Sequence, residues 1–505
     1  MTTPHPASDL NEAPPSGRDG ADARRDRADA RDDGAEARGQ ESDAQRDGAS
    51  FRDPSGFVFW REGRPYRQIQ RSFAAEWDAF EASPLRQRLL ADGRLIPYET
   101  VSVDLARAPG AHAVIRPERI DVVSYPYEWT FGALREAALL TLDIELEALA
   151  AGWSLKDASA YNIQFRDARP IHIDSLSFEG YQDGAPWVAY RQYCEQFLAP
   201  LALVARRDAR LAELLRLGPE GIPLDLASRL LPWRTRLNFG LLSHLHLHAR
   251  AQVRHAGDAA DGGGGEDTAR RTRLTRARLE GLLRNLRATV AGLDWRPAGT
   301  EWADYAEHTS YGERAAADKD RLVDAFVREV PGPHVWDLGA NTGRFSRIAA
   351  EAGKRVVALD IDPAAAERHF RALRAEGRTD ILPLVADIAN PSPALGWAGR
   401  ERRSLLERAD ADAVMALALV HHLAIGRNVP LPMILGLFSD LAPWAIVEFV
   451  PKDDPMVRRL LATRRDVFAE YDLDGFRAAA ASRFEIVREA PIAESPRVLF
   501  LLRRR

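Results

Sequence analysis

The stretch HVWDLGANTGRFSRIAA, residues 334–350, decides the fold of the C-terminal part of this chain. Residues 334–338 form a short apolar run typical of a buried strand, and RFSRIAA begins a helix. Between them lies a tight turn bounded by Gly339 and Gly343, which permit strained backbone and close approach of a ligand. Strand, glycine turn and helix in this order predict the nucleotide-binding corner of a doubly wound α/β sheet.

Two acidic residues extend this pattern. Asp360 ends the next strand-like run, 17 residues after Gly343, where it could accept hydrogen bonds from a ribose diol. Asp337 lies near the end of the first strand. The spacing is therefore D-x-G-x-x-x-G and not the G-x-G-x-x-G of a loop that binds pyrophosphate. A carboxylate there would repel phosphate and would suit a cation, such as the amino group or sulfonium of S-adenosyl-L-methionine (SAM).

Residues 334–348 resemble the first motif of class I SAM-dependent methyltransferases. Later segments resemble the third, fourth and fifth strands of that family in order: 382–391, 411–423 and 440–451. Two final strand-like runs resemble its antiparallel closing hairpin. The resemblance implies an α/β domain with a seven-stranded Rossmann-like sheet over residues 300–505. The alternative from the same pattern is an NAD-binding or nucleotide-free Rossmann domain.

The resemblance also implies a set of SAM-binding residues. The methionine part would be held by Asp337, Gly339, Ala340, Asn341 and Gly343. Asp360 would bind the ribose and Asp387 the adenine amine, and Ala416 or Leu417 would line the pocket at the fourth strand.

Candidate catalytic residues follow the ends of the fourth and fifth strands, where the acceptor sits in this family. His421 and His422 are candidate proton acceptors, because histidine titrates near neutral pH, and Glu448 lies at the end of the fifth strand. The alternative for the two histidines is that they cap a helix or pack beneath the pocket. Lys452 is a further candidate beside the end of the fifth strand. Three more lie on the preceding helices, which often cover SAM in this family: Tyr305, Tyr311 and Lys319.

A second constellation lies in WSLKDASAYNIQFRDARPIHIDSLSFE, residues 153–179. Asp157, Asn162 and Asp174 resemble the catalytic loop and metal-binding acid of kinase-like phosphotransferases, in which Asn and the second Asp hold Mg²⁺. A catalytic-loop His, a Phe-Gly pair after Asp174 and an upstream glycine-rich loop are all missing. The readings left open are an ATP-dependent phosphotransferase, a degenerate kinase-like domain that binds substrate or partner, and a structural polar network.

The whole chain resembles bacterial nodulation-protein-like methyltransferases, which implies methyl transfer without naming an acceptor. We expect a disordered acidic tail at 1–52 and an α+β, partly kinase-like domain with a helical extension at 53–256. A glycine-rich linker with a basic helix follows at 257–299, before the methyltransferase domain. The tail is poor in large apolar residues and cannot offset the entropy of ordering.

Composition narrows the function classes. Of 505 residues one is cysteine, which excludes a disulfide framework. The net charge is −5, and the first 50 residues hold 12 acids and 7 arginines, so the remainder is neutral and gives no support for nucleic-acid binding. No secretory signal or apolar span of about 18 residues is present, so we expect a cytoplasmic protein. The methyl acceptor stays open among a saccharide, a lipid-linked intermediate, a small metabolite and a protein.

Four local patterns add expectations. Residues 56–70 predict a hairpin around Glu62-Gly63, and residues 72–93 and 130–152 predict helices. The basic helix near 272–292 could lie on a membrane or meet a partner, but a solvated amphipathic helix that packs one leucine stripe is favoured. His244 and His248 share a helix face, as metal ligands can, but no third ligand is evident, so we expect no metal site there.

Overall fold

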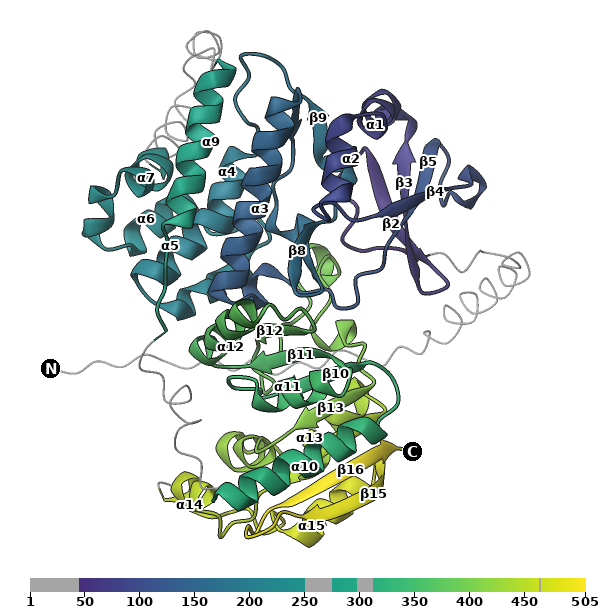
Figure 1. Ribbon diagram of the computed structural model, residues 1–505, viewed down its shortest axis with the longest axis vertical. Coiled ribbons are helices and arrows are strands. Elements are labelled where there is room, and N and C mark those ends of the chain that lie inside the picture. Colours follow the sequence, from purple (N-terminus) through teal and green to yellow (C-terminus); the bar gives the residue numbers. More distant parts are fainter. Residues whose placement is uncertain (1–44, 250–274, 298–311, 463–464) are drawn as a thin grey trace, which may run out of the picture.

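The computed structural model describes residues 45–249, 275–297, 312–462 and 465–505. The N-terminal half lies above the C-terminal half in Figure 1. Most of the tail predicted to be disordered and the glycine-rich part of the predicted linker lie outside the described residues. No helix in the described ranges is long and apolar enough to cross a membrane.

A five-stranded antiparallel sheet begins the N-terminal half, in the order β1-β2-β3-β5-β4. Its strands are β1 (Gln45–Arg46), β2 (Gly56–Arg61), β3 (Arg64–Gln70), β4 (Tyr98–Val101) and β5 (Ala111–Pro117). The predicted hairpin is confirmed, because β2 and β3 pair around Glu62 and Gly63, which both have positive φ as a two-residue hairpin turn requires. β1 pairs with β2, so the last part of the segment predicted to be disordered belongs to this sheet.

The helical stretch predicted at 72–93 forms two helices, α1 (Ala74–Glu81) and α2 (Pro84–Ala91). Ser83 separates them and caps α2 by accepting a hydrogen bond from Arg86 N at 3.2 Å. Pro84 takes the first helical position, where its missing N–H costs nothing. The Ser-Pro pair therefore divides the apolar stripe without ending it.

Helix α3 (Phe131–Ala150) runs through the centre of the N-terminal half. Thr130 caps it by accepting a hydrogen bond from Ala133 N at 3.2 Å. Two short antiparallel pairs follow: β6 (Trp153–Leu155) with β9 (Phe178–Gly180), and β7 (Ile163–Arg166) with β8 (Arg169–His172).

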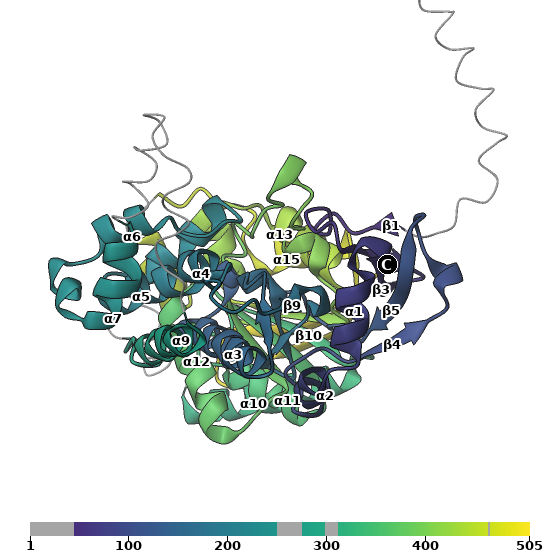
Figure 2. The same ribbon diagram turned by 90° about the horizontal axis from the view of Figure 1, so that it is seen from above.

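A helical extension packs beside α3. Its segments are α4 (Tyr190–Tyr193), α5 (Ala199–Arg206), α6 (Leu224–Leu230), α7 (Phe239–Leu241) and α9 (Arg276–Ala291). Helix α9 is the predicted basic helix, and it lies alongside α3 in both views (Figures 1 and 2). Its leucine stripe, which includes Leu279, Leu283 and Leu286, is fully buried. The prediction that this helix packs its leucine stripe against the protein is therefore confirmed. Its apolar face is not available to a membrane.

The C-terminal half is built on a seven-stranded sheet in the order β12-β11-β10-β13-β14-β16-β15. The strands are β10 (His334–Leu338), β11 (Arg355–Asp360), β12 (Ile381–Val385), β13 (Ala413–Ala416), β14 (Trp444–Phe449), β15 (Phe484–Pro491) and β16 (Val498–Arg504). Five strands are parallel, and β16 and β15 close the sheet antiparallel. This confirms the α/β prediction, and the sheet order is that of the class I methyltransferase fold.

Helices cover both faces of this sheet. The helices are α10 (Glu313–Glu329), α11 (Arg344–Glu351), α12 (Pro363–Glu376), α13 (Leu431–Leu441), α14 (Pro455–Leu461) and α15 (Leu473–Ala481). Alternate side chains of each strand enter two different cores, one with α10 and α11 and one with α12, α13 and α15. Burial on both faces explains why these strands are continuous apolar runs.

The second of these cores continues into the N-terminal half. Trp129 of the N-terminal half makes a β-bridge to Leu384 of β12, and both are buried in one cluster that includes α3 and the helical extension. Glu128 and Arg408 form an ion pair across the junction, with both side chains 1% exposed. The domain limits at 52/53, 256/257 and 299/300 stay predictions, because the last two fall outside the described residues.

Candidate functional site

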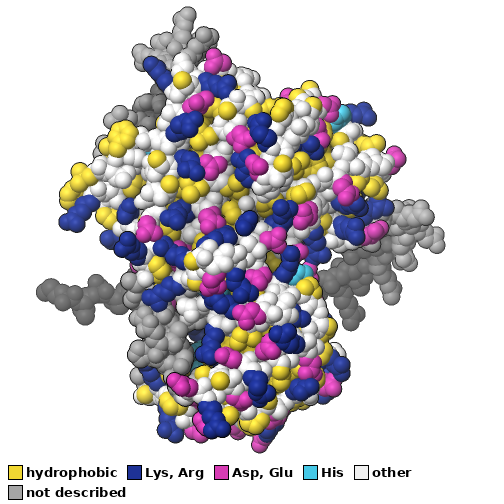
Figure 3. All heavy atoms as spheres, viewed as in Figure 1, with side chains coloured by type: hydrophobic (Ala, Val, Ile, Leu, Met, Phe, Trp, Pro, Cys, Tyr) yellow, Lys and Arg dark blue, Asp and Glu magenta, His cyan; other side chains and the backbone are white. Residues whose placement is uncertain are grey.

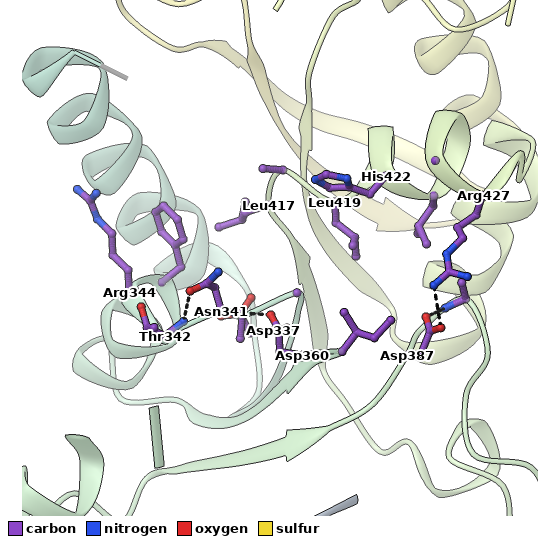
Figure 4. Close-up of a pocket in the computed structure, with 18 of the residues that line it drawn as sticks. Asp337, Asn341, Thr342, Arg344, Asp360, Asp387, Leu417, Leu419, His422 and Arg427 are labelled. Atoms are coloured by element: carbon purple, nitrogen blue, oxygen red, sulfur yellow. Dashed lines mark hydrogen bonds and ion pairs between the residues drawn. The ribbon is translucent and has the colours of Figure 1, made fainter. Parts of the chain in front are cut away.

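A cavity of about 450 Å³ opens at the carboxyl ends of β10, β11 and β13. Its wall combines the glycine loop, the ends of three strands and the start of α10. Figure 4 shows Asn341 and Thr342 on one side of it and Asp387 and Arg427 on the opposite side, with Leu417 and His422 between them. This position, outside the carboxyl ends of parallel strands, is where open α/β sheets bind ligands.

The loop between β10 and α11 has a backbone that depends on glycine. Gly343 has φ +81°, and a Cβ added to it would lie 2.0 Å from Nε2 of the buried His369. Asn341 also has positive φ (50°), a conformation that asparagine tolerates better than most residues. The loop is pinned to the next strand, because Gly339 N donates to Leu359 O at 2.8 Å.

Asp360 joins this loop to the cavity. Its Oδ2 accepts a hydrogen bond from Asn341 N at 2.7 Å and its Oδ1 accepts one from Asp362 N at 2.8 Å. Burial raises the pKa of Asp360 to about 6, although these two N–H donors act in the opposite direction. The carboxyl both holds the loop and forms part of the cavity wall.

Asp337 is a second buried acid on the same wall. Its Oδ2 accepts a hydrogen bond from Ser346 Oγ at 2.6 Å, and the residue is 2% exposed. Burial raises the pKa of Asp337 to about 6 as well. Two buried acids beside one cavity make this end favourable for a cationic ligand group.

Asp387 stands at the opposite side, after β12. Its Oδ1 accepts a hydrogen bond from Ala389 N at 2.8 Å, and its Oδ2 lies 3.2 Å from Arg427 Nη2. The resemblance to methyltransferases implied that this carboxylate contacts the adenine amine. The structure pairs it with Arg427, which was not singled out because it lies 40 residues away in the chain.

The end of the cavity beside α10 is lined by charged groups. Lys319 Nζ donates to Glu448 Oε2 at 2.6 Å and lies 4.4 Å from the centre of the Phe345 ring. Arg497 Nη1 lies 3.3 Å from Glu448 Oε1, and Arg497 Nε donates to Asp454 at 2.7 Å. Lys319 and Arg497 reach the cavity wall, whereas Glu448 is fully buried behind them. Arg497 precedes β16 and had no motif that could have identified it.

The two histidines occupy different places. His422 lines the cavity, whereas His421 is fully buried, with no hydrogen-bond partner for either ring nitrogen among the described residues. Their ring centres are 4.1 Å apart. Burial lowers the pKa of His422 to about 4 and holds the pKa of His421 well below its usual value. Both rings are therefore neutral at pH 7.

The remaining predicted binding residues lie on or near the wall. Gly339, Ala340 and Asn341 line the cavity, whereas Gly343 supports the loop from behind. Ala416 is fully buried within β13, and the wall beyond that strand is formed by Leu417, Ala418 and Leu419. Of the two residues predicted to line the pocket at the fourth strand, the structure therefore places Leu417 there. Tyr305 and Tyr311 lie outside the described residues, and Lys452 instead pairs with Asp466.

The second constellation is brought together in the N-terminal half, but its side chains are bound by neighbouring protein groups. Asp174 Oδ1 lies 2.6 Å from Arg67 Nη1 and accepts a hydrogen bond from Leu176 N at 2.8 Å. Although burial acts to raise the pKa of Asp174, the Arg67 guanidinium holds it below the usual value. Arg67 belongs to β3, so this contact joins the N-terminal sheet to the loop.

Asp157 and Asn162 are engaged in the same way. Asp157 Oδ1 accepts hydrogen bonds from Ser159 N at 2.9 Å and from Gln192 Nε2 at 2.8 Å. Asn162 Nδ2 donates to Ser177 Oγ at 3.2 Å. No group of three or more His, Cys, Asp or Glu in the described part of the chain is arranged to hold a metal ion.

The histidines of the helical extension are also held by neighbours. His244 lies 2.6 Å from the Tyr190 hydroxyl through Nδ1 and 2.8 Å from Asn285 Oδ1 through Nε2. His248 stacks on the Tyr190 ring, with ring centres 5.1 Å apart. The single cysteine, Cys194, is buried nearby.

Similarity to known proteins covers almost the whole chain. It is 36% identical over 464 residues to nodulation protein NoeA of Rhizobium meliloti (strain 1021), across 91% of this chain and 96% of that protein. The chain belongs to the NoeA family. A shorter match, 31% identical over 96 residues, links 18% of the chain to 44% of the uncharacterized methyltransferase YrrT of Bacillus subtilis (strain 168). No protein-family model matches the chain.

Solved structures similar to this NoeA-family chain include two methyltransferases. Magnesium protoporphyrin IX methyltransferase (ChlM) of Synechocystis PCC 6803 with bound SAH is 18% identical over 40% of this chain and 93% of that one, with a TM-score of 0.28. The bifunctional kinase-methyltransferase WbdD is 15% identical over 42% of this chain and 45% of that one, with a TM-score of 0.29. At this identity and TM-score, neither match says what the NoeA-family chain binds.

Proposed function

We propose that this protein transfers a methyl group from SAM to an acceptor bound at the Lys319 end of the cavity. The observation that carries the proposal is the joining of the glycine loop to Asp360 at the carboxyl edge of a sheet with methyltransferase order. The cavity, at about 450 Å³, falls within the range of about 300–1,000 Å³ typical of small-molecule sites.

The residues present fit SAM. Gly343 leaves the loop a tight turn that a Cβ would block, and the loop backbone forms one cavity wall. Asp360 offers carboxylate oxygens to a ribose diol, and Asp337 places a second acid near the cationic groups. At the other side Asp387 and Arg427 would bracket the adenine. When bound, SAM supplies a sulfonium-activated methyl group.

The protein's own part in the reaction is orientation and proton transfer. Lys319 Nζ, held by Glu448 and by the Phe345 ring, can donate a hydrogen bond to an acceptor oxygen. His422 is neutral at pH 7 because burial lowers its pKa to about 4, so a ring nitrogen can accept a hydrogen bond from the acceptor, although this low pKa makes the ring a weak base. In this proposal Glu448 positions Lys319, and His421 supports His422 from behind without touching the acceptor.

Calorimetric titration of the full chain with S-adenosylhomocysteine tests the cofactor site. We expect micromolar binding that weakens at least tenfold in Asp360→Ala and in Ala389→Trp. Ala389 is exposed on the cavity rim, so a larger side chain should fill the adenine end without disturbing the fold. Asp380→Asn, at the opposite end of β12, is the control and should bind as the wild type does. Absence of binding in the wild type would overturn the proposal.

Variants of the charged end test the acceptor side. In an assay that follows the labelled methyl group from SAM into candidate acceptors of each class, Lys319→Met should lower turnover at least tenfold while S-adenosylhomocysteine affinity stays unchanged. His422→Gln should lower turnover, and it should remove the part of the dependence of turnover on pH that comes from titration of His422. Turnover in both variants equal to that of the wild type would rule out these roles.

The phosphotransfer alternative for the N-terminal half stays a prediction, and no contact among the described residues favours it. Asp174 is paired with Arg67, and Asp157 and Asn162 are bound by neighbouring side chains. These contacts are those of a polar network that joins the sheet to the loop, which favours a structural or binding role for this half.

A further inference from the structure

Exposed apolar side chains gather at the outer end of the helical extension. Trp233 is 66% exposed, Leu237 76%, Phe239 72% and Leu247 49%, and we call these four residues the Trp233 patch. Figure 3 shows hydrophobic side chains at this outer corner, over α6 and α7, with Lys or Arg side chains beside them. Single exposed apolar residues are ordinary, but a group with an exposed Trp and Phe marks an interaction surface.

The backbone under the patch is firmly held. Thr235, between Trp233 and Leu237, is buried, with its hydroxyl 2.9 Å from His246 Nε2. Gly240, next to Phe239, packs so closely on α9 that an added Cβ would lie 1.9 Å from Thr289 Oγ1. Thr235 and Gly240 are thus turned inward, whereas the large apolar side chains of Trp233, Leu237 and Phe239 are turned outward.

The charge around the patch is positive. Residues 229–249 contain three arginines and no acidic residue, in a chain whose net charge is −5. Arg234 and Arg236 are exposed, and neither forms an ion pair with a carboxylate in the described residues. Arg229 pairs with Asp225, so these other two arginines are the charges available to a partner.

We propose that the Trp233 patch docks this protein onto the surface of a bilayer that contains anionic lipids. Trp and Phe rings enter the boundary between headgroups and acyl chains, where an apolar body and a polar edge are both accommodated. Arg234 and Arg236 then face the anionic headgroups, and each adds roughly fivefold in affinity at low salt. The unpaired arginines distinguish this partner from a second copy of the chain, which would have to place its own arginines against them.

Docking through the Trp233 patch differs from the membrane alternative considered for the basic helix. The leucine stripe of α9 is buried, whereas the four residues of the Trp233 patch, at positions 233–247, are exposed. The proposal does not depend on methyl transfer, because its readout is vesicle binding alone.

Flotation of the full chain with phosphatidylcholine vesicles, with and without phosphatidylglycerol, tests this directly. We expect binding only to the anionic vesicles, and a loss of most binding when the salt is raised to about 0.5 M, where the Debye length falls below about 5 Å. Trp233→Ser/Phe239→Ser should weaken binding at least tenfold, and Arg234→Gln/Arg236→Gln should do so at low salt.

Two controls make the result specific. Trp397→Ser removes a Trp that is 73% exposed in the C-terminal half, and Arg321→Gln/Arg328→Gln removes the same charge from α10. Both should bind anionic vesicles as the wild type does. Absence of wild-type binding, equal losses in the controls, or a Trp233 variant that changes only the oligomeric state would each overturn the proposal.

Discussion

The buried ion pair between Glu128 and Arg408 should hold the two halves together. Arg408 Nη groups donate to Glu128 and to Val123 O, and its guanidinium lies over the Tyr125 ring at 4.2 Å. Arg408 Nε donates to Arg403 O at 3.1 Å, so the arginine is anchored in the C-terminal half. Glu128→Gln keeps the shape of the side chain but leaves the guanidinium buried with neutral partners only.

The size of the effect follows from this burial. Removing one member of a buried ion pair costs about 3–5 kcal/mol, and the amide of Gln should retain one hydrogen bond and place the loss near the lower limit. At about 2.1 cal/mol/K per residue, the unfolding entropy of a 505-residue chain that unfolds in one transition is about 1.1 kcal/mol/K, so a loss of about 3 kcal/mol lowers Tm by roughly 3 °C. Because one apolar cluster spans both halves, we expect the transition to remain a single one in the wild type.

Differential scanning calorimetry of the full chain measures this shift. Asp410→Asn, which removes the exposed Arg119–Asp410 pair at the same junction, is the matched control and should cost less than about 1 kcal/mol. Glu128→Leu/Arg408→Met should recover much of the loss, because it leaves no unpaired charge. A Glu128→Gln shift no larger than that of Asp410→Asn would refute the reasoning.

Gly343→Ala should lower S-adenosylhomocysteine affinity at least tenfold, because its Cβ would lie 2.0 Å from His369 Nε2; an unchanged calorimetric affinity would contradict the loop geometry. Wild-type affinity should fall as pH is lowered through about 6, where Asp360 becomes protonated, and Asp360→Asn should make that profile less steep. Without ligand the pH dependence has the opposite sign, because the folded state binds this proton more tightly than the unfolded state does. In urea titrations the unfolding free energy should therefore decrease as the pH rises from about 4 to about 6. Asp174→Asn should lower the unfolding free energy at pH 7 without changing ligand affinity, because Arg67 loses its buried partner; since the pKa of Asp174 is lowered, the wild-type advantage should disappear as pH falls below about 4. Equal stability at pH 7 would contradict that role.

Local patterns predicted much of the fold. The strand, glycine turn and helix of residues 334–350 are present, as is the hairpin of β2 and β3. Both depend on neighbouring residues, since hydrophobic period and turn chemistry act over a few positions. The division of the 72–93 helix at Pro84 was visible in the sequence but outweighed by the apolar stripe.

Pairings between distant residues were not predictable in this way. Arg427 with Asp387, Arg497 with Glu448 and Arg67 with Asp174 join residues separated by 40 to 107 positions. Each arginine is one of many in the sequence, and nothing local selects which carboxylate it will meet. The prediction that Asp387 and Asp174 would face ligands rested on their own motifs, which contain no information about these partners.

The sequence by itself determined the order of the strands and helices in the C-terminal half, the glycine loop and the acids at its sides. It did so because these features follow from short-range sterics, hydrogen bonding and periodic burial. Only the tertiary structure decided which residues face the cavity, placing Lys319, Arg497 and His422 on its wall and Glu448 and His421 behind them. It also decided that the two halves share a core and that the Trp233 patch stays exposed, since burial depends on how complete elements pack on one another.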